Sequence, residues 1–320
     1  MQAHIIVDGR LERTSSVEVI RAAHAAGRPL WVELGEHARE AELLLAEAFG
    51  IHPLVIEDIF RERSFPKIDE LDGYIYVVVH ALRQVDDPTL ADLTDLDLVI
   101  GPTFILTQHR EGPATARLRA RLEASPHLLG QGPAWLAHAF IDAVVDRFVP
   151  FMEALKGRID AAELRVISAS TDEKDLLPEL VALKRSIQAV DRIAHHQRDI
   201  LRQLSRSEYA PIPQAARLYF RDVYDHFMHV AEEAEISKDI VTGAIDAYVN
   251  VQSYRMNDTV KRLTLISTVM LPLNLIASFY GMNFTSLPGL GSRWGFLGVI
   301  ALMISVTAGI WTYFKARRWV

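Results

Sequence analysis

The chain has 320 residues, of which 50% are hydrophobic and 23% are charged, and its formal net charge is -7. This composition excludes a disordered chain, and the absence of cysteine excludes disulfides, thiolate catalysis and thiol zinc sites. A bound metal would therefore meet oxygen or imidazole ligands. The acidic net charge, with no basic stripe interleaved with aromatic residues, argues against nucleic acid as a partner.

Residues 1 to about 130 mix short strand-like runs with helix-like stretches, which predicts a small α/β domain. Strands are expected over 30–34, 74–79 and 96–107, with a hairpin turn at Gly101-Pro102, and helices over 36–49 and 114–123. The chain has no glycine-rich phosphate loop, no Gly-x-Ser-x-Gly elbow and no His-Glu-x-x-His motif. We therefore expect no enzymatic activity and no enzymatic cofactor.

The middle of the chain has a helical period. Residues 135–206 predict two long antiparallel helices, with a break near 168–175. From Gln214 there is no proline before Pro272 and a single glycine, Gly243, so one helix on the order of 100 Å long could continue toward the C-terminus. Such a helix cannot bury itself against its own chain alone, which predicts bundling with other copies or with neighbouring helices.

Two runs near the C-terminus carry no charged side chain, residues 263–280 and 296–314. Each is long enough to cross the hydrocarbon core of a bilayer, so two membrane helices are expected, with a buried core hairpin as the alternative. Basic residues lie before the first run and after the second, which predicts that both ends of the chain are cytoplasmic. The N-terminus lacks the uninterrupted apolar stretch of a secretory signal.

A stripe of mostly polar residues follows alternating steps of three and four along the long helix and into the first span. Its members are Asp246, Asn250, Ser253, Asn257, Val260, Thr264, Ser267, Leu271, Asn274 and Ser278. In a parallel bundle this spacing defines one inward-facing seam, and a dry seam would need Leu, Ile or Val there. The stripe predicts a water-filled pore in which Val260 and Leu271 could gate by dewetting. The alternative is that these small polar residues join packed transmembrane helices.

The first span ends in Tyr280, Gly281, Met282, Asn283 and Phe284, followed by a short loop with two glycines and a proline. At this position the Gly-Met-Asn triplet resembles the signature of the CorA family of divalent-cation channels. The resemblance extends from about Trp31 to the C-terminus and includes residues 50–59, residues 220–226 and the basic tail at 315–319.

The resemblance implies an α+β membrane protein that forms a funnel-shaped homopentamer in the inner or plasma membrane and conducts Mg2+. The expected parts are a cytoplasmic α/β domain at 1–130, long stalk helices at 131–262, a pore-lining transmembrane helix at 263–283, an extracytoplasmic loop at 284–293, a second transmembrane helix at 294–314 and a basic cytoplasmic tail at 315–320. The selectivity mouth would comprise Tyr280, Gly281, Met282 and Asn283. Leu263 and Leu271 match the hydrophobic constriction of the family, and Pro272 follows it.

The chain also departs from the family pattern. Magnesium-transporting members carry an acidic residue in the outer loop, whereas here Gly289 stands at that position and Arg293 is the charge of the loop. Capture of cations at the mouth should be weaker as a result. Asn274 replaces the usual threonine below the mouth. Co2+, Ni2+ and Zn2+ are therefore further candidate ions, and a Zn2+ importer of the ZntB type, with proton coupling, is the alternative within the same fold.

The two aspartates that bind regulatory Mg2+ between subunits in the family match Asp58 and Asp222. Spacing alone adds a second candidate site, because Asp222, Asp225, His226 and His229 lie on one face of a helix and suit Zn2+, Ni2+ or Co2+. A solvated polar face is the alternative for this group. For the whole chain, the competing function from another class is a membrane-tethered metal sensor or adaptor that does not conduct.

Overall fold

We analysed a computed structural model of the chain. It describes residues 1–7, 10–35, 39–61, 65–83, 86–109, 119–120, 127–168, 175–282, 293–317 and 319. The chain divides into two compact units, Met1–Ile245 and Asp246–Val320, and the boundary lies within one long helix. Each unit is described separately below.

The first unit contains a mixed seven-stranded sheet in the order β2-β1-β3-β7-β6-β5-β4. Its strands are β1 Gln2–Val7, β2 Arg10–Thr14, β3 Leu30–Leu34, β4 Lys67–Leu71, β5 Tyr74–Leu82, β6 Leu93–Ile100 and β7 Phe104–His109. Strands β3 and β7 are parallel, and the other neighbouring strands are antiparallel. The predicted turn at Gly101-Pro102 is confirmed: the Gly101 N–H donates to the Phe104 carbonyl at 2.8 Å, so the predicted run 96–107 belongs to two paired strands.

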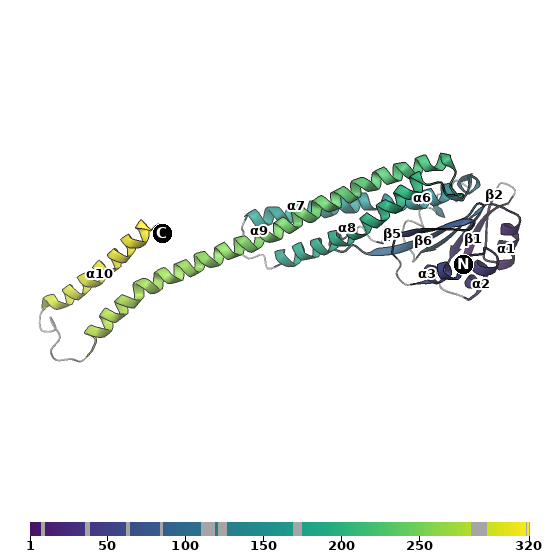
Figure 1. Cartoon of the computed structure of the whole chain (residues 1–320). Coiled ribbons are helices and arrows are strands. Elements are labelled where there is room, and N and C mark those ends of the chain that lie inside the picture. Colours follow the sequence, from purple (N-terminus) through teal and green to yellow (C-terminus); the bar gives the residue numbers. More distant parts are fainter. Residues whose placement is uncertain are drawn as a thin grey trace. The chain divides into compact units, whose positions relative to one another are not determined.

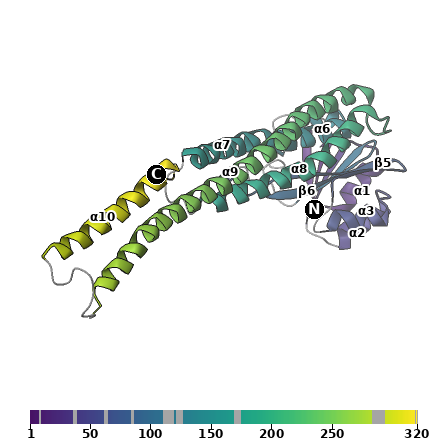
Figure 2. The same ribbon diagram turned by 60° about the vertical axis from the view of Figure 1, so that its left-hand side comes forward.

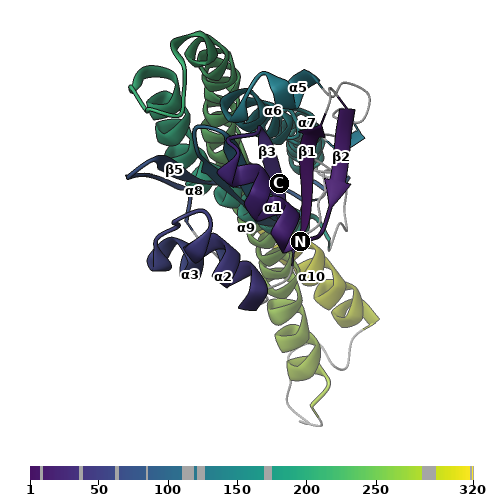
Figure 3. The ribbon, with the colours of Figure 1, turned by 90° about the vertical axis from the view of Figure 1, so that its right-hand side faces the viewer.

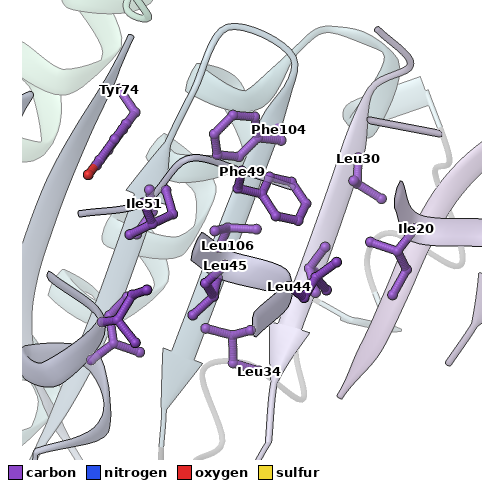
Figure 4. Close-up of a cluster of buried hydrophobic side chains, with 14 of the residues drawn as sticks. Ile20, Leu30, Leu34, Leu44, Leu45, Phe49, Ile51, Tyr74, Phe104 and Leu106 are labelled. Atoms are coloured by element: carbon purple, nitrogen blue, oxygen red, sulfur yellow. The ribbon is translucent and has the colours of Figure 1, made fainter. Parts of the chain in front are cut away.

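Three short helices cover one face of the sheet, α1 Val17–Ala25, α2 Arg39–Glu47 and α3 Pro53–Phe60. Ser16 caps α1 by accepting the Val19 N–H, and His52 caps α3, where Pro53 takes a first-turn position that needs no hydrogen-bond donor. The core between these helices and the sheet includes Leu44, Phe49 and Phe104, shown in Figure 4. The predicted helix at 36–49 corresponds to α2. Most of the predicted helix at 114–123 lies outside the described residues.

Helices α6 Pro133–Val145 and α8 Leu176–Arg206 pack on the opposite face, preceded by the short α5 His127–Gly130. Figures 1 and 3 show the sheet between the two helical layers. Trp31, which alternates with core residues along β3, meets the Phe140 ring of α6 edge-on at 5.3 Å. Residues 135–206 form α6, α7 Phe148–Ser168 and α8, one helix more than the two predicted. The chain turns at Arg147, whose buried guanidinium donates to the carbonyls of Leu82 and Arg83.

Helix α9, Gln214–Tyr280, is 67 residues long and confirms the single helix expected from Gln214. Its first half packs beside α7 and α8 (Figures 1 and 2), with Phe220, Val223 and Phe227 buried at alternating steps of three and four. Ion pairs join Lys238 to Asp191 of α8 and Glu233 to Lys156 of α7. In the second unit, the rest of α9 is followed by α10, Arg293–Ala316.

Candidate ion pathway and metal sites

Every member of the predicted polar stripe on α9 is exposed in the chain, from Asp246 to Ser278, and so is Leu263. The apolar members Val260 and Leu271 are exposed as well, at 55% and 70%. No part of the most apolar window of α9 is buried, and the same holds for α10. These two helices are long and apolar enough to cross a membrane, so the chain alone leaves both spans uncovered.

Two threonine hydroxyls along this helix donate to backbone carbonyls one turn earlier. Thr264 Oγ1 donates to the Val260 carbonyl at 2.8 Å, and Thr268 Oγ1 donates to the Thr264 carbonyl at 2.8 Å. Each hydroxyl therefore uses its hydrogen in a bond within the helix, and its oxygen lone pairs can still accept from other groups. Thr264 belongs to the predicted stripe and Thr268 does not, although their local hydrogen bonds are the same. Thr264 thus presents an acceptor to whatever occupies the stripe side of the helix.

The predicted mouth begins where α9 ends. The Gly281 N–H donates to the Ala277 carbonyl at 2.9 Å, and a Cβ at Gly281 would lie 3.0 Å from that oxygen. A side chain there would require the Ala277 carbonyl to move by a few tenths of an ångström. The Tyr280 ring meets Phe279 edge-on at 5.7 Å, and Met282 is exposed. Asn283 and the loop residues through 292, including Gly289, lie outside the described residues.

Asp58 lies on α3, half-buried, with both carboxylate oxygens paired. Lys67 Nζ is 2.7 Å from Oδ2, and Arg61 Nη1 is 3.5 Å from Oδ1. Lys67 also lies 2.8 Å from Asp69 Oδ2 and 5.0 Å above the Tyr76 ring centroid. Burial alone would lower the pKa of Lys67, but its hydrogen bonds to Asp58 and Asp69 outweigh burial and hold that pKa above its ordinary value. The candidate regulatory carboxylate of Asp58 is therefore part of a charged network in which the cation is the Lys67 ammonium.

Asp222, Asp225, His226 and His229 are all exposed on α9. Asp222, Asp225 and His229 each lie two residues after a buried position, so they face away from the helices that α9 packs against. His226 Nε2 lies 4.0 Å from Asp222 Oδ1. In the described part of the chain, no three His, Asp or Glu side chains are placed to hold one metal ion.

The fold separates the two candidate regulatory aspartates. Asp58 lies on α3, on one face of the sheet, whereas Asp222 lies on α9, which packs on helices of the other face (Figure 3). His138 of α6 contacts Phe220 of α9 at 5.6 Å between ring centroids, on that second side. One ion could therefore bridge Asp58 and Asp222 only between two copies of the chain.

Two buried acidic groups were not singled out in the sequence. Tyr76 OH donates to Asp97 Oδ1 at 2.6 Å, and burial raises the pKa of Asp97 to about 8, although the tyrosine hydrogen bond acts in the opposite direction. Burial and the Asp97 carboxylate together raise the pKa of Tyr76. Asp97 lies two residues after Asp95, on the same face of β6. In the sequence, the apolar Val99, which is the next residue on that face, is a weak signal that Asp97 is buried.

The second buried acidic group is Glu33 on β3, which lies on the other side of the central strand β7 from Asp97 on β6. Glu33 accepts hydrogen bonds from His4 Nε2 at 2.7 Å and from Arg119 Nη2 at 2.5 Å. Burial alone would raise the pKa of Glu33, but these two donors outweigh it and lower that pKa to about 2. The His4 ring stacks on Trp31 at 4.3 Å. Both of these donors belong to the fold's own framework, so we assign this cluster a structural role.

Known proteins are similar to this chain over almost its whole length. The family described as "CorA-like Mg2+ transporter protein" matches residues 27–317. A putative metal ion transporter of Bacillus subtilis, YfjQ, is 32% identical over 290 residues, covering 90% of this chain and 89% of the relative. The cobalt/magnesium transport protein CorA of Thermotoga maritima is 30% identical over 311 residues, covering 96% of this chain and 88% of the relative.

Solved structures show the same fold. The complete structure of the CorA magnesium transporter from Methanocaldococcus jannaschii superimposes with a TM-score of 0.80 at 19% identity, covering 100% of this chain and 98% of that one. The ZntB cytoplasmic domain from Vibrio parahaemolyticus gives a TM-score of 0.61 at 10% identity, covering 79% of this chain and 98% of that one. The extent of the family match and the identity to its members establish that this chain belongs to the family of CorA-like Mg2+ transporter proteins.

Proposed function

We propose that this chain is one subunit of a homopentameric channel that passes Mg2+, with Co2+, Ni2+ and Zn2+ as further candidate ions, across the cytoplasmic membrane. The observation that carries the proposal is the polar stripe of α9, exposed along its whole length and continuing into an uncharged membrane span. An anchor needs no polar face in lipid, because an unpaired carboxamide is costly there. A pore does need one. Both ends of the chain would be cytoplasmic, as the basic flanks predict.

In the proposed assembly the stripe faces the central axis, and the apolar residues of α9 and α10 face lipid and neighbouring helices. This arrangement accounts for the exposure of Leu275 and Phe279, which lie off the stripe at 71% and 51%. Leu263 and Leu271 would form apolar rings that exclude water when they close. The membrane potential would drive entry, contributing about 4.6 kcal/mol per 100 mV for a divalent ion, twice the value for one charge.

The lining chemistry suits a hydrated divalent cation. Mg2+ gives up its water reluctantly, and its coordinated waters point their hydrogens outward. The pore should therefore offer acceptors to those hydrogens. The Thr264 hydroxyl has its own hydrogen committed to the Val260 carbonyl, so its free lone pairs are of this kind. Carboxamide oxygens of Asn274 and Asn257 would add acceptors. At the mouth, Asn283 would hold the hydrated ion, with Tyr280, Gly281 and Met282 supporting it.

Regulation would take place at the cytoplasmic surface. A divalent ion bound between Asp58 of one copy and Asp222 of the next would hold adjacent copies together and favour the closed state. The placement of the two aspartates on opposite sides of the sheet supports a site between copies. Asp225, His226 and His229 would extend this site toward transition metals, since imidazole with carboxylate suits Zn2+, Ni2+ and Co2+.

The experiment is metal flux into proteoliposomes that contain a Mg2+-, Co2+- or Zn2+-sensitive dye. Thr264→Val removes an acceptor from the stripe, and Thr268→Val is the matched control, because both variants lose the same kind of hydrogen bond to the helix. We expect Mg2+ entry without a proton gradient, a several-fold loss in Thr264→Val, little change in Thr268→Val, and no entry in Asn283→Ala.

Three results would contradict the proposal. Equal losses in Thr264→Val and Thr268→Val would mean that the stripe does not face the ion path. Zn2+ entry that depends on a proton gradient, with little Mg2+ entry, would assign the chain to the ZntB type of transport. No entry of any ion, from protein that is folded and inserted, would favour a sensor or adaptor.

A further inference from the structure

We propose that Lys67 is a built-in competitor of the regulatory cation: its ammonium occupies Asp58 when no metal is bound and moves entirely to Asp69 when a divalent cation takes Asp58. This inference rests on the proposed function, in which Asp58 is a ligand of the regulatory ion. It adds a residue that sets the cation concentration at which the channel closes.

The contacts of Asp58 identify Lys67 as the competing cation. Lys67 Nζ lies 2.7 Å from Asp58 Oδ2, at hydrogen-bond distance, and Arg61 reaches the other oxygen at 3.5 Å. Arg61 is 59% exposed and also pairs with Glu57, whereas Lys67 is 34% exposed. A half-buried ammonium in direct contact is screened less by water than an exposed guanidinium. Of the two cations that the described residues place at this carboxylate, Lys67 is therefore the stronger.

A divalent ion needs carboxylate oxygens at about 2.0–2.6 Å, closer than an ammonium sits. It cannot share Oδ2 with Lys67 without placing two positive charges in contact, so the ammonium must leave. Metal binding at Asp58 is thus an exchange of one cation for another.

Lys67 has a second acceptor already in place. Its Nζ lies 2.8 Å from Asp69 Oδ2, and its charge lies over the Tyr76 ring, 5.0 Å from the centroid. Lys67 and Asp69 alternate along β4, and their side chains lie on the same face of the sheet. The ammonium can therefore leave Asp58 without losing its remaining partners. Asp69 should lower the cost of the exchange, and it should do so only while Lys67 is present.

The last point separates direct exchange from general electrostatics. Through-space effects predict that removing a positive charge helps cation binding, that removing a negative charge hinders it, and that the two effects add. In direct exchange, Asp69 acts through Lys67, so the effect of Asp69→Asn disappears once Lys67 is replaced. A double-mutant cycle measures this difference.

The experiment is a Mg2+ titration of the full-length protein in detergent, followed by its thermal unfolding temperature. Lys67→Met keeps the apolar stem over Tyr76, and we expect the Mg2+ midpoint to fall by about three- to tenfold. Lys67→Gln is a second variant with the same expected direction. Asp69→Asn should raise the midpoint by a similar factor, and the double variant Lys67→Met/Asp69→Asn should match Lys67→Met. Lys156→Met removes a lysine ion-paired with Glu233 and serves as the control without effect.

The outcomes distinguish the two levels of the proposal. If Asp58→Asn titrates as the wild-type protein does, the regulatory site itself is wrong, and the role of Lys67 fails with it. If Asp58→Asn abolishes the Mg2+ effect while neither Lys67 variant moves the midpoint, the site stands and the competitor is wrong. Additive effects in the double variant also overturn the exchange, in favour of through-space electrostatics.

Discussion

The Tyr76 hydroxyl donates a 2.6 Å hydrogen bond to Asp97 inside the sheet, on the face that Lys67 and Asp69 share. Cross-strand pairing explains this shared face, since Val78 lies opposite both Lys67 and Asp97, and Tyr76 lies opposite Asp69. A polar layer thus extends from the buried centre of β6 to the edge strand β4 and on to Asp58 of α3. Asp58, the candidate regulatory carboxylate, joins that layer through its ion pair with Lys67.

Replacing Asp97 by Asn should change how stability depends on pH. The pKa of Asp97 is raised from 3.8 to about 8 in the folded chain, so unfolding releases a proton between these values and wild-type stability falls as pH rises. Asn has no proton to lose, and its side-chain oxygen can accept from Tyr76. Between pH 5 and pH 8 the variant should gain on the order of 2–4 kcal/mol relative to wild type.

Thermal or urea unfolding of the first unit's transition, at pH 5 and pH 8, measures this difference. Asp160→Asn, at an exposed position of α7, is the control and should leave the pH slope unchanged. Parallel pH profiles for wild type and Asp97→Asn would disprove a raised pKa at this site.

Replacing Glu33 by Gln should have the opposite pH signature. The pKa of Glu33 is lowered to about 2, so its contribution to stability is complete above pH 5 and is lost as pH falls toward 2. At pH 7 the variant should be less stable by about 2–3 kcal/mol, because it loses the charge that His4 and Arg119 pair with. The difference in stability from wild type should then shrink as the pH falls toward 2. Unfolding of both proteins measured from pH 7 to pH 3 checks this, and a difference that stays constant over this range would contradict it.

Gly281→Ala should impair transport. A Cβ at this position lies 3.0 Å from the Ala277 carbonyl oxygen, so the end of α9 must shift just before Asn283. We expect Mg2+ flux to fall several-fold. Gly157→Ala is the matched control, because nothing lies within 4 Å of its Cβ on α7, and it should stabilise the protein by about 0.5–1 kcal/mol without changing flux. Normal flux in Gly281→Ala would show that the mouth tolerates the shift.

Gly289→Glu should increase Mg2+ uptake at low external concentration. The variant places a carboxylate in a loop, residues 284–293, whose sequence has none, and a negative charge raises the local concentration of cations. The gain should shrink as salt is raised, because exposed charges are screened beyond about 10 Å at 0.1 M ionic strength. Gly289→Gln is the neutral control of nearly the same size. A gain of equal size in Gly289→Gln, or one that is independent of salt, would exclude an electrostatic cause.

The sequence by itself determined the features that depend on local periodicity. The absence of proline and of further glycine before Pro272 predicts α9, and two runs without charge predict the spans. Hydrophobic repeats near 3.6 residues are set by neighbours a few positions away, so a single sequence displays them. The Gly-Met-Asn triplet at the end of the first span is also a local feature. Its position relative to the span can be read from the sequence, and this position indicated the family.

The tertiary structure decided what depends on residues far apart in the chain. Strands β3 and β7 pair in parallel across some seventy residues, and no local pattern encodes that choice. Asp95 and Asp97 lie on the same face of β6, yet Asp97 is buried and Asp95 only partly so, because burial depends on what packs above the sheet. Likewise, only the packing of α3 and α9 on opposite sides of the sheet keeps Asp58 and Asp222 apart within one chain.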